Sequence, residues 1–131
     1  MDPADKASPL ETLADIEAAY ENMIGFVPPK VRKRLHVSEA IDANTLRLVE
    51  RWRLNALTPA ALDQKTVQLM AFAILLVQDS AAAKNHAHAA IKAGASREEL
   101  HAAAAIANLF RGIAAFNHAG EVLAELYPDD A

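Results

Sequence analysis

The most apolar stretch of the chain runs from Val67 to Val77, where Gln68 is the one polar residue. A helix over these residues is apolar around its whole circumference, so the pattern predicts a helix inside a core, either of one subunit or of an assembly. About eleven residues are too few to cross a bilayer, which takes about twenty. Asp63 is a suitable N-cap, and the polar residues 78–80 predict a break at the other end.

Capping residues, prolines and glycines divide the rest of the chain into further helices. Ser8, Pro9 and Glu11 predict one helix start, and Ser96 with Glu99 predicts another. Gly25 predicts a left-handed helix end. No window shows the period-two alternation of strands, so the sequence predicts an all-α protein of about six to seven helices. The helices are expected near residues 9–23, 29–37, 38–57, 63–77, 81–93, 97–111 and 113–126.

A candidate catalytic group lies in the helix expected from Ala81 to Ala93. On a helical wheel, Asn85, His88 and Lys92 share a polar stripe, whereas His86 lies among alanines on the opposite, inward face. His86 and His88 are about 200° apart, so they cannot chelate one ion together. Imidazole titrates near working pH, which makes His86 the candidate general acid or base. The simpler interpretation is a core histidine whose hydrogen bonds are satisfied.

Composition sets the broad class of the protein. The 131 residues suit one domain, and the absence of cysteine excludes disulfides, thiolate metal sites and thiol redox chemistry. The net charge of −4 gives no reason to expect a nucleic acid or membrane partner. The first residues lack the features of a signal peptide, so we expect a cytoplasmic protein. The basic stripe of Arg47, Arg51 and Arg53 can face a pocket, a partner subunit or water.

Two helices that are apolar nearly all round, residues 67–77 and 102–110, are a large interior for a short chain. Self-association would cover them, so we expect a closed homo-oligomer. The alternative is a monomer with a dense alanine core. Glu98 and His101 have the Glu-x-x-His spacing of helical di-iron sites, but the chain has no second copy, so no metal site is expected.

The order of three motifs resembles the carboxymuconolactone decarboxylase family, which includes alkylhydroperoxidase D-like proteins. These motifs are LDQKTVQLMAFAI, a histidine eight residues before the glycine of AIKAGASREEL, and LFRGIAAFNHAGEVL. The upstream GFVPPKVRKRLHVSEAI is similar to the family's Gly-Phe-Val-Pro segment. The resemblance implies an alkylhydroperoxidase D-like helical bundle that assembles into trimers or hexamers. It covers residues 25–131 as one unit, preceded by an N-terminal helix within residues 1–24.

The peroxidase branch of this family carries a Cys-x-x-Cys pair four residues before the histidine and a glutamate on the preceding helix. When His86 is placed on that histidine, Asp79 and Ala82 stand at the cysteine positions. Gln68 stands where the glutamate is expected, with an offset of one residue in the loop. Because the thiolate is itself the nucleophile, we reject a cysteine peroxidase.

The decarboxylase branch, by resemblance, uses no cysteine, metal or organic cofactor. It implies a lyase or isomerase acting on a small anionic cyclic acid or lactone, with His86 as general acid or base. Asp79 would orient His86 from nearly the same helix face, and Gln68 would hydrogen-bond the substrate. Arg111 is the candidate cation for its carboxylate, with Asn85 as a second substrate-binding residue.

Two other functions stay open. One is a catalytically inactive family member that serves as a binding or scaffolding oligomer, because alanines stand where reactive side chains would lie. The other is a metal-assisted enzyme that recruits histidines across a subunit interface.

Overall fold

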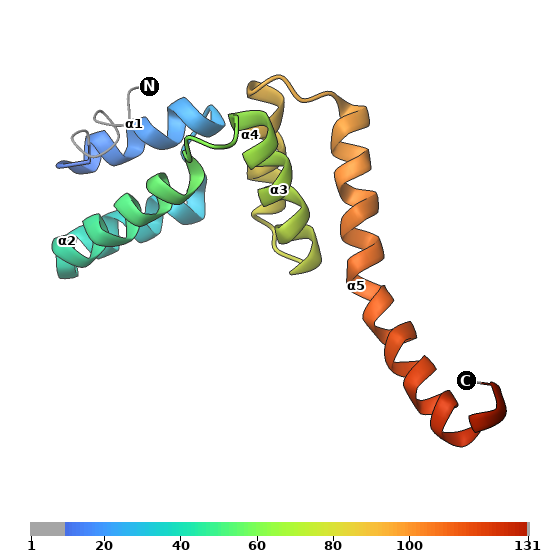
Figure 1. Cartoon of the computed structure of the whole chain (residues 1–131). Coiled ribbons are helices and arrows are strands. Elements are labelled where there is room, and N and C mark those ends of the chain that lie inside the picture. Colours follow the sequence, from blue (N-terminus) through green and yellow to red (C-terminus); the bar gives the residue numbers. More distant parts are fainter. Residues whose placement is uncertain (1–9, 131) are drawn as a thin grey trace.

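The computed structural model describes residues 10–130, and all regular structure in this range is helical. Helix α1 spans Leu13–Ile24, α2 spans Pro29–Leu57, α3 spans Gln64–Val77, α4 spans Ala83–Lys92 and α5 spans Arg97–Leu126; a 3₁₀ turn, η2, covers Pro128–Asp130. Helices α1 and α2 form one layer, and α3, α4 and the first half of α5 pack beside it (Figure 1). The all-α prediction is confirmed.

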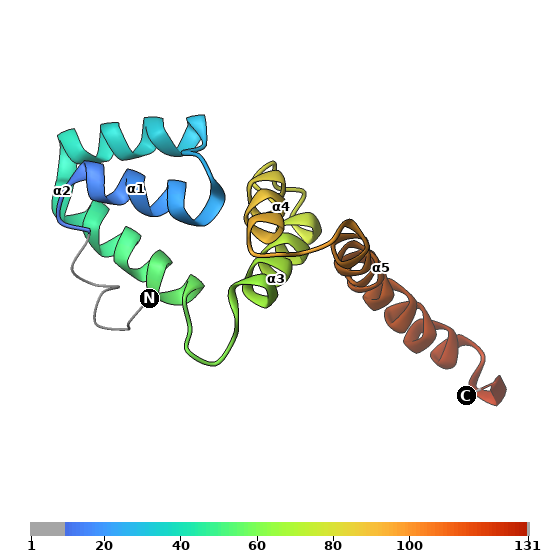
Figure 2. The same ribbon diagram turned by 90° about the horizontal axis from the view of Figure 1, so that it is seen from above.

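Helix α2 is sharply bent at Asp42, where the backbone leaves helical geometry (φ −157°, ψ 84°). The Asp42 carboxylate accepts the backbone N–H of Thr45 at 3.0 Å and so caps the second half. Arg34 and Glu50 would be about 24 Å apart along a straight helix, yet their side chains meet at 2.5 Å. The two halves therefore fold back on each other beside α1 (Figure 2). The expected boundary at Ser38 is wrong by about one turn.

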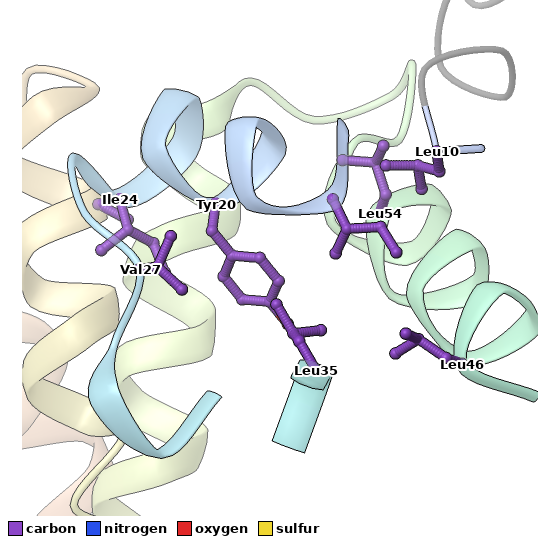
Figure 3. Close-up of a cluster of buried hydrophobic side chains, with 9 residues drawn as sticks. Leu10, Tyr20, Ile24, Val27, Leu35, Leu46 and Leu54 are labelled. Carbon is purple, nitrogen blue, oxygen red and sulfur yellow. The ribbon is translucent and has the colours of Figure 1, made fainter. Parts of the chain in front are cut away.

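The hydrophobic core lies between α1 and the two halves of α2 (Figure 3), and Ala89 of α4 belongs to the same cluster. Of the residues in α3, Val67 and Gln68 are the buried ones. The most apolar helix is therefore at the edge of this subunit rather than at its centre. Buried members of the core are Leu10, Ile16, Tyr20, Ile24, Val27, Leu35, Leu46, Leu54 and Ala89.

Helix α1 begins at Leu13, later than expected. Thr12 accepts the N–H of Asp15, and the Asp15 carboxylate accepts the N–H of Thr12, a complete capping box. Residues 10–12 are not helical, so the helix is shorter at this end than expected, and the expected first residue Pro9 and the expected cap Ser8 lie outside the described residues. The left-handed exit at Gly25 (φ 103°) is confirmed.

The caps of α3 and α5 are those that the sequence predicted. The Asp63 carboxylate accepts the N–H of Thr66 at 2.8 Å. Ser96 and Glu99 form the second capping box, with each side chain accepting the other residue's backbone N–H. Local side-chain chemistry therefore sets these two helix starts.

Helix α5 runs without interruption through Gly112, so the expected break there is wrong. One glycine in a long helix costs about 1 kcal/mol relative to alanine, which the flanking helix formers offset. This continuity is one reason why the described residues contain five α-helices instead of six to seven. Beyond the body of the subunit, the second half of α5 projects alone (Figures 1 and 2).

None of the helices formed by residues 10–130 is both long enough and apolar enough to cross a lipid bilayer.

Candidate functional site

The candidate histidine lies in the first turns of α4, opposite α3. His86 is half-buried, and its Nδ1 atom lies 2.7 Å from the amide oxygen Oε1 of Gln68. Gln68 is 1% exposed, so this hydrogen bond is made in a largely water-free environment. The structure thus brings together His86 and Gln68, two of the residues that the sequence proposed for the site.

Gln68 is held in turn by a second amide. Its Nε2 donates to Oε1 of Gln64 at 3.3 Å, and Gln64 Nε2 donates to the carbonyl of Leu57 at 2.6 Å. Gln64 and Gln68 are four residues apart and therefore share one face of α3. Gln64 was not among the residues predicted for the site, although its position one turn before Gln68 on the same face is visible in the sequence.

His86 is neutral at neutral pH. Burial lowers the pKa of its imidazole from 6.5 to about 4, and the nearby positive charge of Arg53 acts in the same direction. At pH 7 a pKa near 4 leaves on the order of one ring in a thousand protonated. The ring is therefore in the unprotonated form that a general base requires, and its low pKa makes it a weak base and, once protonated, a strong acid.

The guanidinium of Arg53 stacks on an aromatic ring. Its Cζ atom lies 4.1 Å from the ring centroid of Tyr20, a cation–π contact. The Arg53 side chain is half-buried, and no carboxylate among the described residues forms an ion pair with it. This cation, close enough to His86 to lower the pKa of the ring, is available to an anion.

A buried polar cluster lies behind Arg53. The Tyr20 hydroxyl donates to Oε1 of Glu50 at 3.1 Å, and Arg34 Nη2 contacts the same oxygen at 2.5 Å. Glu50 is 3% exposed, and burial raises the pKa of Tyr20 to about 12. Glu50 was not among the residues predicted for the site. Its signal is an acid midway between Leu46 and Leu54, on the apolar face of the second half of α2.

Asp79 and Arg111 meet each other and not His86. The Asp79 carboxylate pairs with Arg111 Nη2 at 2.5 Å, which lowers the pKa of the acid. Arg111 also donates to the carbonyl of Val77 at 3.1 Å, at the end of α3. The expected placement of Asp79 on the face of His86 is wrong, because α4 begins only at Ala83 and Asp79 lies in an exposed left-handed turn (φ 53°).

The polar stripe of α4 faces outward. Asn85 is half-buried next to His86, whereas His88 is exposed and meets the ring of Phe26 edge-on, with centroids 5.3 Å apart. Lys92 Nζ donates to the carbonyls of Glu21 and Asn22 at the end of α1. Lys92 therefore stabilises a helix terminus.

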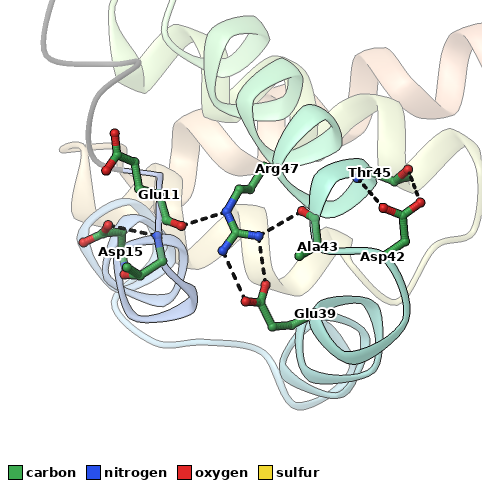
Figure 4. Close-up of polar contacts among 8 residues, drawn as sticks. Glu11, Asp15, Glu39, Asp42, Ala43, Thr45 and Arg47 are labelled. Atoms are coloured by element: carbon green, nitrogen blue, oxygen red, sulfur yellow. Dashed lines mark hydrogen bonds and ion pairs between the residues drawn. The ribbon is translucent and has the colours of Figure 1, made fainter.

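The three arginines of the basic stripe have different surroundings. Arg47 is held by the Glu11 and Ala43 carbonyls at 2.7 and 2.9 Å and by both carboxylate oxygens of Glu39 (Figure 4). Arg51 is exposed. Arg53 is the arginine of the stripe that lies against Tyr20 and near His86.

A cavity of about 450 Å³ opens beside the hydrogen bonds that join Gln64, Gln68 and His86. It lies between α1, the end of α2, the start of α3 and α4. We call it the α1–α4 cavity. Its volume suits a small molecule. Gln64 lines it, and His86 lies about one turn before Ala89 on the same face of α4. The other lining residues are Asp15, Ala18, Ala19, Asn22, Met23, Leu54, Thr58, Ala89, Lys92 and Ala93.

Potential metal ligands do not gather in the described part of the chain. Residues 10–130 contain no cluster of three His, Asp or Glu side chains able to hold an ion. Glu98, from the Glu-x-x-His pair, instead binds the neighbouring Arg97 at 2.8 Å.

Comparison with known proteins agrees with the helical arrangement. The model of the carboxymuconolactone decarboxylase family matches residues 43–125. This segment covers most of the chain and includes His86, Gln68 and Gln64. No curated protein and no solved structure gave a match. The chain therefore belongs to the carboxymuconolactone decarboxylase family.

Proposed function

We propose that the protein is a carboxymuconolactone decarboxylase-like lyase or isomerase that acts on a small anionic cyclic acid or lactone without a cofactor. His86 is its general acid–base residue. The observation that carries this proposal is a half-buried, neutral imidazole held at one nitrogen by the buried amide of Gln68. A fixed neutral imidazole in a partly dry site suits proton transfer at a carbon atom.

The low pKa of His86 favours a base-first order of events. The neutral ring takes a proton from a carbon next to a carbonyl group. The resulting imidazolium, a strong acid because its pKa is about 4, returns a proton to the carbon that holds the electron pair. In a decarboxylation the bond to carbon dioxide breaks, its electron pair stays on the substrate carbon, and one proton taken from water by way of the His86 ring replaces the carbon dioxide, leaving hydroxide.

The substrate carboxylate is held by Arg53 in this proposal. Arg111, the cation that the sequence suggested, is occupied by Asp79 and by the carbonyls at the end of α3. Arg53 is half-buried near His86 without a carboxylate partner among the described residues, and its fork suits a carboxylate. Gln68 holds the His86 ring by its hydrogen bond to Nδ1. Asn85, next to His86, would hydrogen-bond an oxygen atom of the substrate.

Cysteine-based peroxide reduction has no place in this proposal. The chain contains no cysteine, so it lacks the thiolate that would attack the peroxide.

Replacing His86 by Gln tests the catalytic role. We expect turnover of carboxymuconolactone or a related lactone acid to fall by about 10²–10⁴-fold, the usual contribution of a general acid–base group. Helical content and elution volume should stay unchanged. The matched control is His88→Gln on the exposed side of the same helix, which should keep full activity. Equal activity of His86→Gln and wild type would refute the assignment.

A second candidate is a catalytically inactive member that acts as a binding or scaffolding oligomer. Ala82, at a position where a reactive side chain would lie, favours it, as does the structural use of Asp79 and Arg111. A wild-type protein that binds lactone acids without converting them would support this candidate over the enzyme.

We also propose that the subunits assemble, as trimers or hexamers. Large apolar side chains of α3 and α5 are exposed, among them Ile74 at 54%, Phe110 at 65% and Phe116 at 79%. Apolar surface of this extent normally marks an interface.

Replacing Phe116 by Glu should convert the assembly into smaller species, because it puts a charge into the apolar surface of α5. Light scattering coupled to size-exclusion chromatography measures the mass directly. Lys33→Glu, at the exposed start of α2, is the control and should leave the mass unchanged. A wild-type monomer at micromolar concentration would contradict the proposed assembly.

A further inference from the structure

Three hydrogen bonds lead from the end of α2 to His86, and their direction is determined at the first one. The Leu57 carbonyl lies in the last turn of α2, where carbonyl groups lack helical partners. A carbonyl can only accept a hydrogen bond. The group of Gln64 that lies 2.6 Å from it must therefore be the donating Nε2.

The direction of this first hydrogen bond determines the direction of the next two. With its Nε2 at Leu57, Gln64 presents Oε1 to Gln68, which must donate through its own Nε2 at 3.3 Å. Gln68 then presents Oε1 to His86, and an amide oxygen can only accept. The proton must consequently be on Nδ1 of His86. In a neutral ring this leaves Nε2 with a free lone pair.

We propose that Gln64 is a positioning residue that acts through Gln68 to hold His86 as the Nδ1–H tautomer, which makes Nε2 the nitrogen that exchanges protons with the substrate. This inference rests on the acid–base role proposed for His86, but the tautomer itself is a property of the protein without substrate. Gln64 also lines the α1–α4 cavity, so the tautomer is set from a residue that a bound molecule can touch.

The test compares two replacements of Gln64. In Gln64→Leu, Gln68 loses its acceptor and can rotate its amide, so Nε2 of Gln68 can donate to an unprotonated Nδ1. In Gln64→Glu, the carboxylate still accepts from Gln68 and keeps the direction, although Leu57 loses its donor. Both variants should therefore unfold at lower urea concentration than wild type, but only Gln64→Leu should change the tautomer.

Long-range ¹H–¹⁵N spectra of the histidine rings at neutral pH, with His86 assigned from the spectrum of His86→Gln, separate the two neutral tautomers. We expect the Nδ1–H form to predominate in wild type and in Gln64→Glu. Its ratio to the Nε2–H form should fall about tenfold in Gln64→Leu, the scale of one hydrogen bond.

Three results would overturn the role of Gln64. They are an Nε2–H ring in the wild-type protein, an unchanged ratio in Gln64→Leu, and an equal shift in both variants, which would indicate a general loss of structure. These results are separate from the proposed function. Turnover that does not depend on His86 would refute the acid–base role of His86 while leaving the measured tautomer intact.

Discussion

Replacing Gln68 by Glu should raise the pKa of His86 from about 4 to above its ordinary value of 6.5. In wild type, burial and Arg53 lower this pKa, and the neutral amide of Gln68 does not oppose them. A carboxylate in its place would lie about 2.7 Å from Nδ1, in surroundings where charges interact strongly. The introduced carboxylate and the imidazole of His86 should then hold one proton through the neutral range as a coupled unit.

The pKa is read from the pH dependence of the imidazole Cε1–H signal. Gln68→Leu is the matched control, since it removes the hydrogen bond without adding charge and should leave the pKa low. A His86 pKa that stays below 6.5 in Gln68→Glu would show that another group dominates the environment of the ring.

The same substitution should reverse the effect of His86 on stability in weak acid. In wild type the folded pKa is lowered, so the stabilising contribution of the neutral ring is complete above pH 6.5 and is lost as the pH falls toward 4. In Gln68→Glu the folded pKa is raised, so the contribution is complete below pH 6.5 and is lost as the pH rises through the new value. Urea unfolding of each protein against His86→Gln at several pH values isolates this difference.

Replacing Arg34 by Met should lower the free energy of unfolding by about 3 kcal/mol, the lower end of the range for breaking a buried ion pair. Glu50 is 3% exposed and would keep only the Tyr20 hydroxyl as a partner. The lower end applies because the Arg34 side chain itself is 42% exposed, which allows water to approach. Urea unfolding measures the change.

The double variant Arg34→Met with Glu50→Leu should recover part of this loss, since no charge is then left in the core, but the buried Tyr20 hydroxyl loses both of these partners. Arg32→Met, on an exposed part of the same helix, should change stability by less than about 0.5 kcal/mol. A loss in Arg34→Met no greater than in Arg32→Met would mean that water already screens Glu50.

The sequence predicted those parts of the fold that neighbouring residues determine. Asp63 and Ser96 cap helices with side chains three residues from their partners, and Gly25 ends α1 in a conformation that suits glycine. Gly112 misled the prediction because glycine both ends helices and occurs inside them, and only its flanking residues decide. The bend at Asp42 was misplaced because Ser38 is an equally good cap by type.

The position of the core could not be read from apolarity alone. Residues 67–77 are the most apolar segment, yet the subunit buries α1 against a folded-back α2. That arrangement depends on contacts between distant residues, such as Arg34 with Glu50. Periodicity within one helix carries no information about which helix becomes its partner.

In the candidate site, too, some residues could be predicted from the sequence and others depend on contacts between distant parts of the chain. His86 followed from its inward place on a helical wheel and Gln68 from family resemblance, and the structure brings the two side chains to 2.7 Å. Asp79 was assigned to the site on the assumption of a continuous helix, which the left-handed turn at that residue excludes. Arg53 could not be distinguished from Arg47 and Arg51 in the sequence, because only the packing of α2 against α1 and α4 gives them different neighbours.

If the subunits assemble as proposed, the projecting half of α5 links folding to protein concentration. From Arg111 to Asp129 every residue except Ala124 is exposed, so this segment gains almost no burial within its own subunit. A helix of about fifteen residues is only marginally stable in water by itself. In the proposed assembly other copies would supply its order, so that coil-to-helix ordering of this tail and subunit association would become a single equilibrium that dilution shifts toward frayed, separate chains.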